Sequence, residues 1–191
     1  MRLNDPLVTS FVFEGIKYQI DLAFDNVLDV FDVLDDKALR DYERVEVCLS
    51  LLLGEEQYDQ SSTINLWNYV YEQFIHIKEE ESILYDRKGN PLPVKTDEEK
   101  EKLIDLEKDA EYIFASFRQA YGMNLFHEQG KLRWEEFQAL LNGLPSNTIM
   151  KRIIEIRSWK PSKGDSAEFR QNMKDLQRKF SLNDKEVDDD E

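Results

Sequence analysis

The chain has 191 residues, of which 41% are hydrophobic and 34% are charged, so it is long enough for one good core and too apolar for wholesale disorder. Its formal net charge of −15 argues against a nucleic-acid-binding protein, because phosphate groups would repel it, and favours solubility and a basic partner. A single cysteine, Cys48, excludes an internal disulfide, and its apolar neighbours predict a buried thiol in a reducing cytoplasm.

The N-terminal residues predict a β-hairpin and no targeting segment. The stretch MRLNDPLVTSF lacks the apolar core of a signal peptide, and the apolar runs of the sequence are too short to span a membrane. Between Thr9 and Asp21, two short β-prone runs flank Glu14 and Gly15, which is a hairpin signal. A lone hairpin is marginally stable, so we expect it to lie on helices or to pair with another chain. Its edge is a route to self-association.

Three helices are predicted to follow, over residues 23–35, about 41–53 and about 62–78. The aspartates of the first lack the central Gly and the following Glu of a calcium loop, so we interpret them as a solvated helix face. Gly54 should end the second helix. Ser61 or Ser62 can cap the third, whose apolar stripe is predicted to begin at Ile64 and Trp67.

The next segment breaks the helical pattern and suggests a division of the chain. It is highly charged and contains the turn KGNP and two prolines, which are typical of a mobile loop or a small hairpin arm. We therefore expect an N-terminal hairpin with helices, a charged loop or arm, a helical unit and a disordered acidic tail, at residues 1–78, 79–100, 101–182 and 183–191.

The helical unit should begin with one long helix. From Leu103 the apolar residues recur at steps of three and four, which places them along one helical face. Gly122 is suited to the left-handed position after a helix, so this helix should end near Tyr121.

Two shorter helices complete the predicted unit. The first covers residues 133–142, and the second runs to Arg157 from a cap at Ser146 or Asn147. Because the link between them is short, we expect a tight helical hairpin packed on the long helix. Arg157 has two interpretations, as a capping cation or as a salt-bridge donor to an acidic helix. Two aromatic residues of the first short helix are predicted to lie in the core, Trp134 and Phe137.

A last amphipathic helix, from Ser166 to Phe180, is the best candidate for binding a partner. A helix beyond the packed unit can swing out or dock in a neighbour's groove. The alternative is a further core helix. The residues predicted to bind a partner are Trp159, Phe169, Met173, Leu176 and Phe180.

The residues that carry chemistry in enzymes form no convincing site in this sequence. His76 and His127 are far apart and have no cysteine partner, which disfavours a zinc or nucleophilic site. Glu135 and Glu136 are adjacent, so they point in different directions on a helix. We found no phosphate-binding, serine-hydrolase or metalloprotease motif. The expectation is a mainly α non-enzyme, a helical bundle with a small N-terminal β-hairpin and no catalytic, cofactor or metal site.

One pattern resembles a known family. An acidic residue followed by YIFASFRQAYGMNL, then LRWEEFQALLNGLPSNT and IIEIR, is similar to the phage proteins known as bacteriophage gene product fifteen. The resemblance is strongest from Asp109 to Arg157 and weaker upstream, where only a hairpin followed by helices matches. These proteins are encoded in the tail-assembly region of long-tailed phages of Gram-positive hosts and are regarded as tail assembly chaperones.

The resemblance implies a homo-oligomeric chaperone that binds the tape measure protein and keeps it soluble until tail tube subunits assemble around it. The tail tube protein is a further implied partner. The expected location is the host cytoplasm, with the protein absent from the mature virion and bound to neither nucleic acid nor membrane. The alternative is a small acidic phage regulator that binds a host protein, with its charge mimicking that of DNA.

Overall fold

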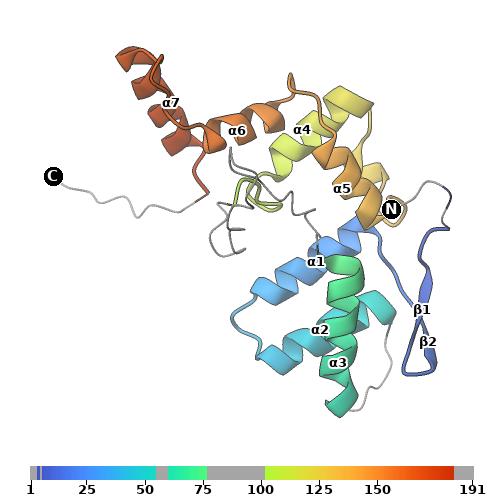
Figure 1. The fold of residues 1–191 in the computed structure, drawn as a ribbon. Helices are drawn as coiled ribbons and strands as arrows, with labels where there is room; N and C mark the ends of the chain where they lie inside the picture. The colour runs from blue at the N-terminus through green and yellow to red at the C-terminus, as the bar shows by residue number, and fades with distance from the viewer. Residues whose placement is uncertain (1–3, 5, 55–59, 77–101, 183–191) are drawn as a thin grey trace, which may run out of the picture. The chain divides into compact units, whose positions relative to one another are not determined.

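The computed structural model describes residue 4 and residues 6–54, 60–76 and 102–182, and only the backbone of residues 60 and 61. Over this part of the chain it is mainly helical with an N-terminal two-stranded antiparallel sheet, as predicted (Figure 1). The charged segment 79–100 and the acidic tail 183–191 lie outside the described residues, so their predicted character stays a prediction. The chain divides into two compact units. Unit 1 comprises residues 1–79 and 125–142, and unit 2 comprises residues 80–124 and 143–191.

The hairpin of unit 1 consists of β1 (Ser10–Phe13) and β2 (Ile16–Gln19). Its two-residue turn forms because Glu14 and Gly15 both have positive φ angles, 48° and 81°, which matches the twist of the flanking strands. Phe11 stacks on the opposite Tyr18 with a ring-centroid distance of 5.4 Å. One face of the hairpin is covered by aromatic rings, since Phe11 lies 5.2 Å from the ring of Phe74. The hairpin therefore lies on helices, as expected.

The helices of unit 1 begin with α1 (Phe24–Asp35), α2 (Asp41–Leu53) and α3 (Gln60–Val70). α1 packs on α2, and α2 packs on α3. Gly54 follows α2 with a φ angle of 89°, as the sequence predicts. Their shared core contains fully buried aliphatic side chains and a buried thiol, Val27, Val30, Cys48, Leu49, Leu52, Leu66 and Val70.

The third helix differs from its prediction in three ways. It starts at Gln60, so Ser61 and Ser62 are not its caps, and it continues after Val70 as a π-helix, η1 (Tyr71–Ile75). Its buried stripe starts at Thr63 rather than at Ile64, whose side chain is 55% exposed. The helix is rotated in this way because a stripe of 63, 66, 67 and 70 has ideal i, i+3, i+4, i+7 spacing. The predicted continuation to residue 78 lies partly outside the described residues.

Unit 1 is completed by a segment that returns from far along the chain. The segment follows a short 3-10 helix, η3 (Leu125–His127), and main-chain hydrogen bonds join its residues 132–134 to residues 22–24. The Phe24 nitrogen donates to the Leu132 carbonyl oxygen at 2.9 Å, and the Trp134 nitrogen donates to the Leu22 carbonyl oxygen at 2.8 Å. They place α5 (Trp134–Asn142) on α1, where Phe137 stacks on Phe24 at 5.1 Å between ring centroids. Trp134 and Phe137 are both buried, as predicted.

Unit 2 contains α4 (Ala110–Tyr121), α6 (Ile149–Ser158) and α7 (Ala167–Lys179). α6 packs on α4 and on α7. At the first of these interfaces the Met150 backbone nitrogen donates a hydrogen bond to Ser116 Oγ at 3.1 Å, and both residues are fully buried. Gly122 ends α4 in the left-handed conformation with a φ angle of 66°, as predicted.

The predicted helical hairpin is wrong, because its two helices belong to different units. α5 packs on α1 in unit 1, whereas α6 packs on α4 in unit 2. Spacing and loop length are local signals, and they do not reveal the backbone pairing that recruits α5. The predicted caps of α6 are also wrong, since its N-cap is Thr148.

The long helix of the prediction is shorter at its N-terminal end. α4 starts at Ala110 rather than Leu103, because polar side chains hold the preceding residues in a turn. Asp105 Oδ1 accepts hydrogen bonds from the backbone nitrogens of Glu107 and Lys108, and Asp109 Oδ2 accepts one from the Asp105 nitrogen. These bonds satisfy the backbone in a non-helical form.

Candidate functional site

A buried ion pair organises unit 2. Arg157 on α6 donates to both oxygens of Asp109, at 2.6 and 2.8 Å, and only 8% and 1% of the two side chains are exposed. The guanidinium also donates to the carbonyl oxygens of Leu103 at 2.8 Å and Phe180 at 2.7 Å. Arg157 thus joins the turn before α4, the helix α6 and the end of α7. Its interpretation as a salt-bridge donor is the correct one.

α7 is attached to unit 2 mainly through its C-terminal half. The Gln177 amide nitrogen donates to the carbonyl oxygens of Ile156, Arg157 and Trp159, at 3.0, 3.3 and 2.9 Å. These acceptors lie at the C-terminal end of α6, where the helix leaves carbonyl groups without intrahelical partners. The side chain of Gln177 thereby fastens α7 to α6.

The N-terminal half of α7 is less covered. Ser166 caps the helix by accepting a hydrogen bond from the Phe169 nitrogen at 3.1 Å. Phe169 is 45% exposed and makes an edge contact with the ring of Trp159, at 6.0 Å between centroids. None of the residues of α7 is buried. Phe169 is therefore the most exposed of the five residues predicted to bind a partner.

The five residues predicted to bind a partner fall into two groups. Trp159 and Phe169 lie together at the exposed end of α7. Phe180 lies at the other end, where its ring makes an edge contact with Tyr112 at 6.1 Å. Met173 and Leu176 are half-buried between them. Partner binding by these residues stays a prediction.

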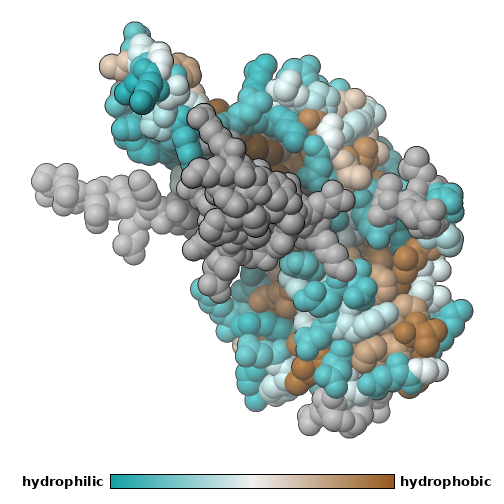
Figure 2. All heavy atoms as spheres, viewed as in Figure 1, coloured by the Kyte–Doolittle hydropathy of each residue, from teal (hydrophilic) through white to brown (hydrophobic). Residues whose placement is uncertain are grey.

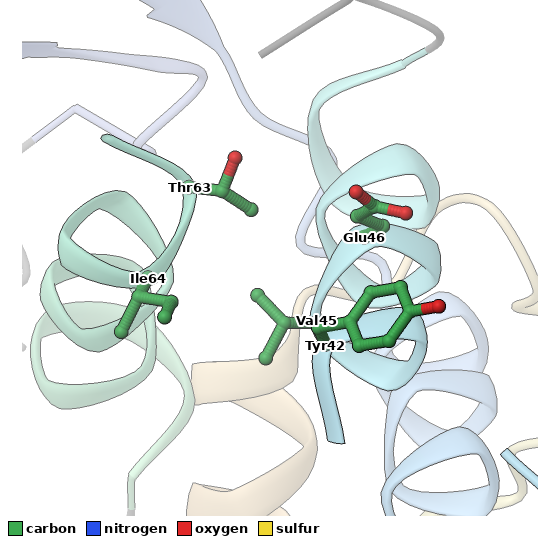
Figure 3. Close-up of a pocket in the computed structure, with 5 residues that line it drawn as sticks. All are labelled: Tyr42, Val45, Glu46, Thr63 and Ile64. Carbon is green, nitrogen blue, oxygen red and sulfur yellow. The ribbon is translucent and has the colours of Figure 1, made fainter. Parts of the chain in front are cut away.

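A half-open groove between α2 and α3 is a second candidate, which the sequence analysis missed. Figure 3 shows Val45 extending from α2 towards α3, on which Thr63 and Ile64 lie. The groove encloses about 370 Å³, and its remaining lining residues are Tyr42 and Glu46. Its walls are mostly apolar, and Glu46 adds a carboxylate. The signal that could have revealed it is the better helical spacing that begins at Thr63, which leaves Ile64 at the surface.

Exposed aliphatic side chains also lie on the hairpin and in the residues before it. Leu7, Val12 and Ile16 are all exposed, with Val12 at 60%. Figure 2 shows hydrophobic side chains gathered over the hairpin of unit 1. Val12 pairs with Lys17 and Ile16 pairs with Phe13, so Val12 lies on the face opposite Phe11, whereas Ile16 lies at the end of the face that carries Phe11 and Phe13.

Two titratable side chains of unit 1, Cys48 and Glu43, have shifted pKa values. Cys48 is fully buried and its thiol donates to the Val30 carbonyl oxygen at 3.8 Å, while burial raises the pKa of this thiol to about 11. At the start of α2, hydrogen bonds from Arg40 lower the pKa of Glu43 to about 2.

Among the described residues there is no group of three or more His, Cys, Asp or Glu side chains that could hold a metal ion. None of the helices in this part of the chain has the length and apolar character needed to cross a bilayer.

The fold and these surfaces define a mainly helical, strongly acidic protein with apolar side chains at its surface. The profile of the bacteriophage Gp15 protein family matches residues 3–182, which is nearly the whole chain. The chain therefore belongs to the bacteriophage Gp15 protein family and is a phage protein, which confirms the resemblance seen in its sequence. Comparisons with curated proteins and with solved structures give no match.

Proposed function

We propose that this protein is a phage tail assembly chaperone that binds the tape measure protein and keeps it soluble and assembly-competent. The observation that carries this proposal is the family match over residues 3–182, together with the tail-assembly role that the resemblance implies. Several copies would cover one tape measure chain in the host cytoplasm. Assembly of tail tube subunits would then displace them, so the protein would be missing from the finished virion.

The surface of unit 1 suits a client of this kind. A tape measure protein that waits for its tube must have its apolar helical faces covered, and Leu7, Val12 and Ile16 offer exposed aliphatic contacts. Unit 1 carries 19 Asp and Glu against 8 Lys and Arg, so a complex built on it would stay charged and soluble. We assign client binding to the face of the hairpin that carries Val12, which is opposite the face that carries Phe11.

The test is co-expression with the tape measure protein encoded by the same phage. The wild-type chain should bring the tape measure protein into the soluble fraction and co-purify with it. The variant Val12→Glu should lose most of this effect, whereas Phe126→Glu, which changes an exposed apolar residue of unit 1 in η3, should keep it. Purified virions should lack the protein by mass spectrometry.

The possible outcomes test the chaperone function and the hairpin assignment separately. If the wild-type chain leaves the tape measure protein insoluble, the chaperone proposal is wrong, and the acidic regulator becomes the better candidate because of the charge of unit 1. If the wild-type chain succeeds and the hairpin variant succeeds equally, the function stands and the hairpin assignment is wrong.

A further inference from the structure

We propose that the acidic tail, residues 183–191, binds back along the C-terminal half of α7 and covers the basic surface formed there by Lys174, Arg178 and Lys179. The proposal goes beyond the proposed function and does not depend on it, because it concerns a contact within one chain. It is tested without any client, so either proposal can fail without the other.

The basic surface lies beside the residues that attach α7 to its own unit. Lys174 and Arg178 are four residues apart, so they lie on the same side of the helix, and both are exposed. Together with Gln177 and Ser181 they line an open hollow of about 360 Å³. Among the described residues no ion pair joins Lys174 to an anion, and Arg178 pairs only with Asp175 of the same helix. The hollow therefore offers cations to an anionic segment.

The positive charge of α7 is concentrated in this half of the helix. Residues 174–179 carry 3 Lys and Arg against 1 Asp, whereas residues 167–173 carry 1 against 1. An anionic segment is thus attracted to the C-terminal half of α7 and not to the N-terminal half.

The charge of the acidic tail matches the charge of the segment that it follows. Residues 143–182, which contain α6 and α7, carry 9 Lys and Arg against 4 Asp and Glu, a net charge of +5. Residues 183–191 carry 1 against 6, a net charge of −5. The rest of the chain is acidic and repels the tail, so this basic segment is where the tail finds complementary charge.

The point at which the tail begins brings it to this surface. The Leu182 carbonyl oxygen accepts a hydrogen bond from Lys108 Nζ at 2.9 Å, and the Phe180 carbonyl oxygen accepts one from Arg157 at 2.7 Å, so the end of the described chain is fixed beside the end of α7. A segment of nine residues can extend about 30 Å. Lys174 is only about 8 Å along the helix from its last residue, Lys179, so the tail is long enough to pass the whole basic surface.

Tethering makes weak exposed ion pairs sufficient for this contact. One such pair contributes little by itself, because water and salt screen it. The tail is attached next to its binding surface, however, so its effective concentration there is high and does not depend on the protein concentration. The attraction requires no secondary structure in the tail. An anionic partner of this surface would first have to displace the tail, which makes the tail an internal competitor.

The test is paramagnetic broadening in NMR spectra from a nitroxide at the end of the tail, attached in the variant Cys48→Ser/Glu191→Cys. The label should strongly broaden the amide signals of Lys174 to Arg178. Neutralising the tail with Asp188→Asn/Asp189→Asn/Asp190→Asn should remove most of this broadening, as should Lys174→Glu/Arg178→Glu. Salt at about 0.5 M, where the Debye length is about 4 Å, should do the same.

Two further variants make the test specific. Lys160→Glu/Lys163→Glu changes two exposed lysines before the other end of α7 and should leave the broadening intact. Combining Lys174→Glu/Arg178→Glu with Asp188→Lys/Asp190→Lys reverses both partners and should restore the broadening.

Three results would overturn the proposal. These are no broadening of α7 with the unmodified charges, broadening that persists after the tail is neutralised, and equal loss in Lys160→Glu/Lys163→Glu. Circular dichroism shows that each variant is folded. If Lys174→Glu/Arg178→Glu is not, the asparagine variant of the tail decides, because it changes no residue of α7.

Discussion

Arg157 and Asp109 form a two-point ion pair that is almost completely buried, and Arg178 and Asp175 form an ion pair of the same 2.6 Å closest distance at the surface of the same unit. Side-chain exposure is 8% and 1% for the first pair but 63% and 52% for the second. The two pairs share chemistry and differ in burial, so they allow a matched comparison of what burial does to an ion pair.

Arg157→Met should strongly destabilise unit 2. The substitution leaves a buried carboxylate without its cation and removes the donors to the Leu103 and Phe180 carbonyl oxygens, so the free energy of unfolding should fall by about 3–5 kcal/mol. Arg178→Met should change it by less than about 0.5 kcal/mol, because water screens the exposed pair. Urea unfolding of both variants measures the difference. Equal losses would contradict the central role of Arg157.

The turn of the hairpin should respond to two substitutions in opposite directions. Gly15→Ala should cost about 1 kcal/mol, because the φ angle of 81° disfavours any residue with a Cβ although no atom lies within 4 Å of the added methyl group. Glu14→Asn should stabilise the turn by about 0.5 kcal/mol, because asparagine tolerates the φ angle of 48° better. Hydrogen exchange of the Ile20 amide, which bonds to the Thr9 carbonyl oxygen, measures both.

Gly164→Ala is the control for the turn. Gly164 also has open space around it but no positive φ angle, so alanine there should be neutral or slightly stabilising. If Gly15→Ala were equally harmless, backbone conformation would not be what fixes this turn.

The start of α2 should depend on pH. Arg40 donates to Glu43 from its backbone nitrogen at 2.8 Å and from its guanidinium at 2.6 Å, and these bonds lower the pKa of Glu43 from 4.5 to about 2. The folded state therefore binds this proton less readily than the unfolded state. The stabilisation is present above about pH 4.5 and is lost as the pH falls through about 2. A carbon-13 NMR titration of the Glu43 carboxylate should show this pKa, and Arg40→Ala should raise it towards 4.5. An unchanged pKa of Glu43 in the Arg40→Ala variant would contradict the capping interaction.

Cys48 should be inert in the folded protein. Burial raises the pKa of its thiol from 9.0 to about 11, so the reactive thiolate is about a hundredfold rarer at pH 8 than for an exposed cysteine. A disulfide reagent should therefore label it only after urea unfolds the chain. Because the pKa of the thiol is higher in the folded state, the neutral thiol contributes to the stability of the fold below about pH 9. This contribution is lost as the pH rises through about 11.

A relocated thiol is the control for this experiment. In the variant Cys48→Ser/Val47→Cys, the thiol moves one position to an exposed side of the same helix and should react rapidly without urea. Fast labelling of the native Cys48 at pH 8 would show that the core around α1 and α2 opens readily.

Local sequence patterns determined the secondary structure well where one residue type fixes the backbone. Gly54 and Gly122 end their helices because their positive φ angles, 89° and 66°, are strained for other residues, and the Glu14–Gly15 pair sets the hairpin turn for the same reason. Trp134 and Phe137 were predictable as core residues, because large aromatic side chains at helical spacing must be covered. These features need no knowledge of distant residues.

The sequence by itself therefore determined the helices, the hairpin and the family, and the tertiary structure decided how they combine. Backbone pairing between residues 22–24 and 132–134 assigns α5 to unit 1, and no local pattern encodes a partner more than a hundred residues away. The rotation of α3 that exposes Ile64 likewise depends on which face meets α2. A helical stripe can start at either of two neighbouring residues, and only packing against a specific partner selects one, because burial is a property of the pair and not of the helix alone.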